Sequence, residues 1–254
     1  MPYSPFSLGD FTTETLRTLL SGPLPVVVLV PVGSVEPHGP HLPLRTDTII
    51  GESAAYRAAE KLEGRSVRAL VGPSIPYGVT RFAEGFAGAI SVTESALVGF
   101  LHAVVSGFIA AGFSHVCLVN NHLEPAHDAA VRQSIEGIAT GRASIASPLT
   151  RRHARTLSPE FKSGACHAGR YETSLVLAAT PDLVHQGRAE SLPTLTTSLS
   201  TGIREGKTNF LAMGMTEAYT GAPAEASREE GLDLTDKLAE MIVIEVEEGL
   251  AAQR

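Results

Sequence analysis

The apolar run LPVVVLVPV (residues 24–32) is followed without a break by GSVEPHGPHLPLRTD (33–47). A continuous β-branched run of this length is typical of a strand that is covered on both faces in a parallel sheet. The second segment is dense in titratable side chains: Glu36, His38, His41 and Asp47. Such groups are costly to desolvate unless something pairs with them. The two segments therefore predict a buried strand that ends in a polar site, reached by water or held together by a positively charged species.

Outward from this stretch, short apolar runs alternate with segments of helical periodicity. We predict further strands in three places: 67–78 (running into a Pro/Gly loop), 115–120 and 143–147. Helices are predicted in five: 46–64, 93–112, 125–141, 171–180 and 228–250. This alternation favours an α/β fold with a mostly parallel central sheet and helices on both faces. No composition break or linker divides the chain, so we expect a single domain over residues 1–254.

The composition limits the classes of function. The 254 residues are 43% hydrophobic and carry a net charge of −7, which argues against a nucleic-acid partner because such proteins are normally basic. No apolar stretch approaches the ~18 residues that a membrane span requires, and the N-terminal segment has no signal-peptide pattern. The two cysteines are too few for a disulfide framework. We therefore expect a cytoplasmic protein with no membrane or nucleic-acid partner.

A second polar cluster, NNHLEPAH (120–127), directly follows the predicted strand at 115–120. Ligands of parallel sheets gather outside the carboxyl ends of the strands, so the two clusters are expected to be neighbours if their strands lie close in the sheet. Imidazoles mixed with carboxylates suit Zn²⁺ or Mn²⁺. We predict five metal ligands: Glu36, His38, Asp47, His122 and Glu124.

The spacing within each cluster bears on this prediction. Glu36-x-His38 and His122-x-Glu124 each place two side chains on one face of an extended segment. Asp47 opens a predicted helix, where its two oxygens could bridge two ions. One His-x-Glu pair alone is more often solvated surface. Two pairs at two strand ends, together with Asp47, favour a metal site.

A third segment, SGACHAGRYETSLVL (163–177), contributes His167, which we predict to transfer a proton. The alternative is that His167 is a loop histidine that only forms hydrogen bonds and has no role in catalysis. Glu172 lies near a helix start, where it could simply complement the helix dipole. Nothing near Cys166 in the sequence shows how its thiolate would form, so a nucleophilic cysteine is disfavoured.

Three motifs, GSVEPHGPHLPLRTD, NNHLE and CHAGRYETS, resemble those of the creatininase (creatinine amidohydrolase) family. EAYTGAPAEASREEG near the C-terminus resembles the closing segment of that family, so the resemblance runs from about residue 24 to residue 231 in the same order. It implies an α/β/α sandwich, assembly as a homohexamer, and two divalent ions per chain, zinc or manganese.

The resemblance also implies a role for each matching residue. One ion would be held by Glu36, Asp47 and His122, and the other by His38, the same aspartate and Glu124. The catalytic histidine of the family falls on His167, and the glutamate that follows it falls on Glu172. Either Glu124 or Glu172 would complete the second metal site.

The implied reaction is hydrolysis of an amide, lactam or formamide C–N bond of a small molecule. A metal-bound hydroxide would attack the carbonyl, and His167 would protonate the departing nitrogen. Creatininase clamps its substrate with tryptophans and this sequence has none, so creatinine is not the expected substrate. The alternatives are a metallopeptidase that trims a short peptide, as in mycofactocin maturation, and a non-catalytic, oligomeric binding member of the family.

Three further segments bear on specificity. Residues 80–92 and 202–214 are expected to help line the substrate pocket. TRRHAR (150–155) either holds a substrate phosphate or carboxylate or is a solvated loop.

Overall fold

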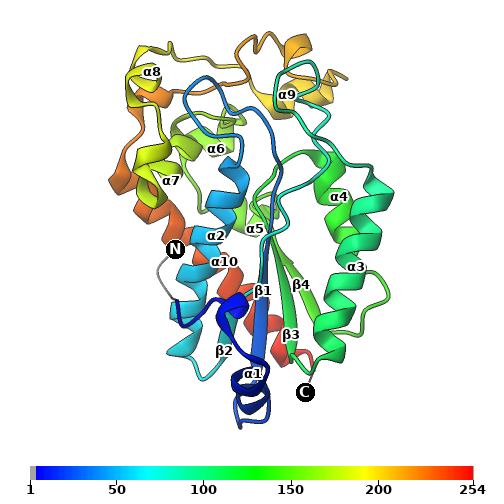
Figure 1. The fold of residues 1–254 in the computed structure, drawn as a ribbon. Coiled ribbons are helices and arrows are strands. Elements are labelled where there is room, and N and C mark those ends of the chain that lie inside the picture. The colour runs from blue at the N-terminus through cyan, green and yellow to red at the C-terminus, as the bar shows by residue number, and fades with distance from the viewer. Residues whose placement is uncertain (1–3, 254) are drawn as a thin grey trace.

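A parallel four-stranded sheet forms the centre of the computed structural model, which describes residues 4–253 (Figure 1). Its strands lie in the order β2-β1-β3-β4 and have these bounds: β1 Val26–Val32, β2 Arg68–Val71, β3 His115–Asn120 and β4 Ala143–Ala146. Every neighbouring pair is parallel, as predicted. The predicted domain runs over residues 1–254, so its first three residues and its last lie outside the described part.

Side chains of β1 alternate between two apolar cores on the two faces of the sheet. Val27 and Leu29 pack with the first core, which is built with α2 (Thr46–Glu63), α7 (Arg170–Ala179) and α10 (Arg228–Ala251). Val28 and Val30 pack with the second, built with α1 (Thr13–Leu20), α3 (Glu94–Ala110) and α4 (Pro125–Gln133). Helices therefore cover both faces, which confirms the three-layer α/β/α sandwich (Figure 1).

The remaining helices are short. They are α5 (Arg151–Ala154), α6 (Pro159–Ser163), α8 (Gln186–Ser191) and α9 (Leu199–Arg204). Single 3₁₀ turns lie at Leu8–Asp10, Pro181–Leu183, Leu211–Met213 and Pro223–Glu225. None of the helices in the described part is both long and apolar enough to cross a bilayer.

The strand order creates a point where two connections diverge. From β1 the chain passes through α2 to β2, on one side of β1, and then through α3 to β3, on the other side. Val32 and Asn120, the last residues of β1 and β3, are paired. In open α/β sheets, ligands bind at such a switch point, outside the carboxyl ends of the strands. The predicted proximity of the two polar clusters is thereby confirmed.

One predicted element is shorter in the structure. The helix expected over 125–141 ends at Gln133, and Gly137 farther along has φ +80°, a left-handed conformation that an α-helix cannot contain. The strand predicted within 67–78 is β2, which ends at Val71 and runs into a loop at Gly72 and Pro73, as expected. Backbone pairing with the end of β1 resumes beyond the proline, where Ile75 bridges to Val32.

Candidate metal centre

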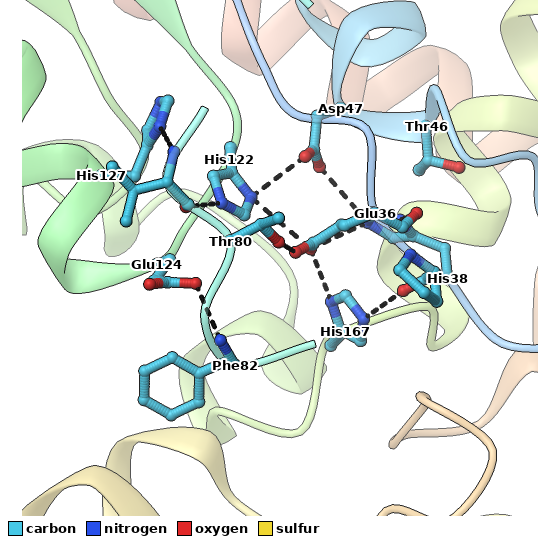
Figure 2. Close-up of polar contacts among 12 residues, drawn as sticks. Glu36, His38, Thr46, Asp47, Thr80, Phe82, His122, Glu124, His127 and His167 are labelled. Carbon is cyan, nitrogen blue, oxygen red and sulfur yellow. Dashed lines mark hydrogen bonds and ion pairs between the residues drawn. The ribbon is translucent and has the colours of Figure 1, made fainter. Parts of the chain in front are cut away.

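The end of β1 lies against the start of α2. A Cβ on Gly33 would lie 3.0 Å from both Asp47 Cβ and Thr48 N, so any larger residue would push the start of α2 away from the end of β1. The segment between them loops over the carboxyl end of the sheet and returns to place Asp47 in the first turn of α2. Glu36 and His38 on this loop are therefore held next to Asp47, as Figure 2 shows.

Six titratable side chains from four parts of the chain converge here. Three come from the loop and the start of α2, one follows β3, and two come from the start of α7 and the residues before it; Figure 2 labels five of the six, all but Glu172. All are buried, with exposed fractions of 6% or less: Glu36, His38, Asp47, His122, His167 and Glu172. Because unpaired charges are so costly inside a protein, this cluster requires compensation.

Each of the three imidazoles is fixed by a backbone carbonyl on its outer side. His38 Nδ1 lies 3.1 Å from the Glu36 carbonyl oxygen, and His122 Nε2 lies 2.7 Å from that of Val79. His167 Nε2 is 3.0 Å from the carbonyl oxygen of Pro37. A carbonyl oxygen can only accept, so each of these nitrogens carries the hydrogen. In the neutral rings the other nitrogen is left with a lone pair directed at the carboxylates.

The inner nitrogens lie close to carboxylate oxygens. His122 Nδ1 is 3.0 Å from Asp47 Oδ2 and 3.5 Å from Glu36 Oε1. His38 Nε2 is 3.3 Å from Asp47 Oδ1 and 3.5 Å from Glu172 Oε2. Within residues 4–253, neither His38 Nε2 nor Asp47 Oδ2 has a hydrogen-bond partner, although both are buried. Lone pairs that face carboxylates in this way are stabilised by a positive charge between them, supplied either by protons on the imidazoles or by metal ions.

The distances suit a metal ion. Nitrogen and oxygen ligands bound to Zn²⁺ at 2.0–2.2 Å in a tetrahedron lie about 3.3 Å apart, and the pairs described above span 3.0 to 3.5 Å. Two groups of potential ligands share only Asp47: Glu36, Asp47 and His122 form one, and His38, Asp47 and Glu172 form the other. A third group joins His167 to Glu36 and His38, which already belong to the first two.

The cluster also attracts positive charge strongly. Burial would raise the pKa of Glu36, but His122 and His167 outweigh it and lower that pKa to about 2. Burial would lower the pKa of His38, but Asp47 and Glu172 raise it to about 10. Competition between protons and metal ions for the same donors is expected of such a site.

A surrounding layer of hydrogen bonds orients the inner side chains. The Thr80 hydroxyl donates to Glu36 Oε2, and the Ala168 N–H donates to Glu172 Oε2 at 2.7 Å. His127 Nδ1 accepts the Val79 N–H at 3.2 Å, so it holds the residue whose carbonyl fixes His122 (Figure 2). Ligand orientation by such partners is common in metal sites. The contribution of Thr80 was missed in the sequence, where nothing marks one threonine among many.

Glu124 lies apart from the other predicted ligands. It precedes α4 as its N-cap, with Pro125 in the first turn, and Oε2 of Glu124 accepts the Phe82 N–H at 3.1 Å (Figure 2). It belongs to none of the ligand groups found among the described residues, whereas Glu172 does. The two-residue spacing predicted a shared face with His122, but in the structure the Glu124 carboxylate is bound by the Phe82 N–H instead of joining the ligand groups. Burial raises the pKa of Glu124 to about 7.

A pocket of about 470 Å³ opens over the cluster. Glu36, Asp47, His122, Glu124, His167 and Glu172 contribute its polar lining, and Phe82, Leu199, Ile203 and Phe210 its apolar walls. The ring of Phe210 lies 4.4 Å from that of His167, centre to centre. Because Phe82 lies in segment 80–92 and both Ile203 and Phe210 lie in 202–214, the prediction that these segments line the pocket is confirmed.

Cys166 also lines the pocket, but its surroundings disfavour a nucleophile. Burial, with Glu172 and Glu160 nearby, raises the pKa of the Cys166 thiol well above its usual value. A reactive cysteine needs the opposite shift, because the thiolate is the nucleophile.

Known proteins share this fold and sequence pattern. The model of the creatininase family, described as creatinine amidohydrolase, matches residues 10–246. The mycofactocin precursor peptide peptidase of Mycolicibacterium smegmatis is 34% identical over 180 residues, 70% of this chain and 66% of that protein. The creatinine amidohydrolase of Pseudomonas putida is 29% identical over 67% of this chain and 70% of its own. A solved structure named "Creatininase Mn" superposes with a TM-score of 0.72 at 22% identity, over 96% of this chain and 98% of that one.

Proposed function

The chain belongs to the creatininase family of hydrolases, and from that premise we propose that it is a metal-dependent hydrolase that cleaves an amide C–N bond of a short peptide. The observation that carries the metal dependence is the position of Asp47, whose carboxylate is shared by two buried groups of potential ligands. Among the described residues, the buried atoms Asp47 Oδ2 and His38 Nε2 have no assigned hydrogen-bond partner. Two cations bridged by this aspartate would satisfy both.

The donor set assigns ligands to two ions. Glu36, Asp47 and His122 would hold one, and His38, the same aspartate and Glu172 would hold the other. Mixed imidazole and carboxylate ligands suit zinc or manganese. When bound, such ions polarise an amide carbonyl and lower the pKa of water. This assignment gives the second site Glu172 in place of Glu124.

Glu124 is then free to transfer protons. Amide hydrolysis takes a proton from water and delivers one to the departing nitrogen. The Glu124 carboxyl lines the pocket, one of its oxygens is held by the Phe82 N–H, and its pKa of about 7 suits both steps. A general acid–base group works best when its pKa lies near the operating pH.

His167 serves to orient the substrate in this proposal. Burial, and the nearby His38, lower the pKa of His167 to about 4, so the ring is neutral at pH 7. Its Nε2–H is fixed by the Pro37 carbonyl, and Phe210 packs against its face. A neutral, immobilised Nδ1 can accept a hydrogen bond from a substrate N–H, and Phe210 excludes water from that contact.

A peptide substrate is favoured over a small cyclic amide by the relatives. Mycofactocin precursor peptide peptidases are 32% to 34% identical to this chain, and the creatinine amidohydrolase of P. putida is 29% identical. The chain has no tryptophan with which to enclose a small flat ring. The second candidate, hydrolysis of a small-molecule amide, is supported by the P. putida relative and by the modest pocket of about 470 Å³.

Metal analysis and a substrate panel test the proposal together. The purified chain should contain about two zinc or manganese ions, as a two-metal hydrolase does, and Asp47→Asn should lose most of them. Asp233→Asn, an exposed aspartate on α10, is the matched control and should retain them. Short peptides should be cleaved in preference to creatinine and simple amides. A metal-free protein that takes up neither ion would refute the metal dependence, and faster turnover of small amides would favour the second candidate.

A further inference from the structure

A larger groove opens beside the metal pocket. It encloses about 1290 Å³ and lies among residues of α4, α5, α6 and α9, which Figure 1 shows near the carboxyl ends of the strands. The groove and the pocket have five lining residues in common: Leu123, Pro125, Cys166, Leu199 and Ile203. A chain bound at the metal cluster can therefore continue into the groove along a shared wall.

The groove is basic although the protein is acidic. Four cationic side chains line it, Arg132, Arg151, Arg155 and Lys162, against a single carboxylate, Asp128. Asp128 is already paired with Arg132, at 2.7 Å. Within the described residues, the other three cations form no ion pair with a carboxylate, and all three are exposed. In a chain with a net charge of −7, such a concentration of unpaired positive charge indicates an anionic ligand.

The neighbouring Arg152 differs from the groove cations because it is already paired with carboxylates. It lies on the same short helix as Arg151, but it pairs with Glu245 at 2.6 Å and Glu248 at 2.7 Å, both on α10. It does not line the groove. The arginines of the TRRHAR run therefore have two different roles. Arg152 forms ion pairs between α5 and α10, while Arg151 and Arg155 remain available to a ligand.

Between the cations the groove is apolar. Leu123, Leu149, Phe161, Leu199 and Ile203 contribute to its lining. Leu149 and Ile203 are 41% and 37% exposed, so they offer apolar surface that a ligand in the groove can cover. A simple anion such as phosphate would make no use of this surface. A peptide with apolar and acidic side chains would use both features.

We infer that the groove binds the part of the peptide that extends beyond the cleaved bond, and that it selects acidic side chains flanked by apolar ones. The inference rests on the proposed function only in taking the ligand to be the substrate. Guanidinium groups bind carboxylates through paired N–H donors, which gives orientation as well as attraction. Contacts remote from the cleaved bond help to position it at the reacting centre.

Binding of a matched pair of labelled peptides tests the inference directly. The two peptides have the same length and the same leucines, and differ only in carrying glutamate or glutamine at alternate positions. Fluorescence anisotropy with the metal-loaded chain should give a Kd about tenfold lower for the glutamate peptide, since several exposed ion pairs each contribute modestly. The preference should weaken in high salt, which screens exposed charges.

Substitutions in the groove test whether its three unpaired cations cause the preference for the glutamate peptide. In Arg151→Gln/Arg155→Gln/Lys162→Gln the two peptides should bind equally, and Lys162→Glu should weaken the glutamate peptide selectively. Arg17→Gln, an exposed arginine on α1, is the control for loss of a single positive charge away from the groove and should keep the preference. Equal binding of both peptides by the wild type, or a preference that survives the triple change, would overturn the inference.

Measurements of peptide cleavage distinguish a failure of this inference from a failure of the proposed function. If peptides are cleaved, the triple variant should raise KM for the glutamate peptide about tenfold with kcat within about twofold, because the lost contacts lie away from the reacting atoms. If no peptide is cleaved but the glutamate preference depends on the three cations, the proposed function fails while the groove remains an acidic-peptide site. Tighter binding of a single-stranded oligonucleotide than of the glutamate peptide would contradict the choice of ligand.

Discussion

The two ends of β3 each carry a buried histidine, and the two differ in what their second ring nitrogen faces. His115 begins the strand and is 0% exposed; its Nδ1–H donates to the Gly141 carbonyl at 2.7 Å, and its Nε2 accepts from the Ser144 hydroxyl at 2.8 Å. His122 follows the other end and is 2% exposed. Its Nε2–H is bound by the Val79 carbonyl, but its Nδ1 faces the carboxylates of Glu36 and Asp47.

The difference teaches that burial does not by itself identify a functional histidine. Burial lowers the pKa of His115, since its partners are neutral. Burial acts on His122 in the same direction, but Glu36 and Asp47 raise its pKa well above the usual value. The ring of His115 has hydrogen-bond partners at both nitrogens, whereas the inner nitrogen of His122 faces carboxylates that favour a positive charge beside it. Substitutions at the two positions should therefore affect different properties.

The largest effect is expected for His122→Gln. Removal of one nitrogen ligand should lower both metal content and kcat/KM by more than about 100-fold, because even the loss of a residue that only orients a ligand costs about 10–100-fold. Elemental analysis and steady-state kinetics provide the two measurements. Retention of full metal content in this variant would exclude His122 as a ligand.

His115→Leu should instead reduce stability. It leaves the Ser144 hydroxyl without its partner in the interior and removes one of two donors to the Gly141 carbonyl, the other being Gln253 Nε2, at a cost of about 1–3 kcal/mol. Urea unfolding of metal-loaded wild type and variant measures this cost. Metal content and kcat/KM per folded molecule should stay within about twofold of the wild type, and a large loss of either would remove the contrast between the two ends of the strand.

His127→Phe tests whether the hydrogen bond between His127 and the Val79 N–H helps to position His122. The phenyl ring fills a similar volume but cannot accept the Val79 N–H, so the carbonyl that fixes His122 is less well held. We expect metal affinity to fall about tenfold, the lower range for such orienting residues. Titration with Zn²⁺ against a chelating indicator gives the affinity. An unchanged affinity would mean that the loop from residue 78 to 80 is held by other contacts.

The smallest effect concerns pH. The pKa of His115 is lowered in the folded protein, so below its unfolded value of about 6.5 the unfolded chain binds more protons. The stability associated with neutral His115 is present above that pH and is lost as pH falls toward the folded pKa. Between pH 7.5 and 5.5, wild type should lose up to about 1 kcal/mol more than His115→Leu. Equal losses in both proteins, measured by urea unfolding, would show that His115 does not titrate in this way.

Local pattern was sufficient to predict the sheet and its main helices. The continuous apolar run of β1 and the capped, periodic segment of α3 are signals within the sequence itself, and Thr93 does cap α3 by accepting the Ala96 N–H. The adjacency of the two polar clusters followed from the behaviour of parallel strands. Helix α4 was predicted too long because alanine-rich periodicity continued past the point where tertiary packing ends the helix.

The arrangement of the site was less accessible from sequence. Glu124 and Glu172 were both identified, but which of them joins the cluster with His38 and Asp47 depends on how α4 and α7 are oriented over the sheet. Thr80 and Phe210 reach the site through loops whose course no local signal determines. The basic groove likewise required the structure, because Arg132, Arg151 and Lys162 belong to three different helices.

The sharing of Asp47 has a consequence for the lifetime of the protein. The potential ligands come from the first quarter of the chain, from its middle and from its third quarter, between Glu36 and Glu172. Ions bound under the proposed function would act as cross-links that tie β1, β3 and α7 together, and their binding energy would add to the free energy of unfolding. The supply of zinc or manganese would then determine how often the loops around the pocket open to proteases, and so how long each molecule persists.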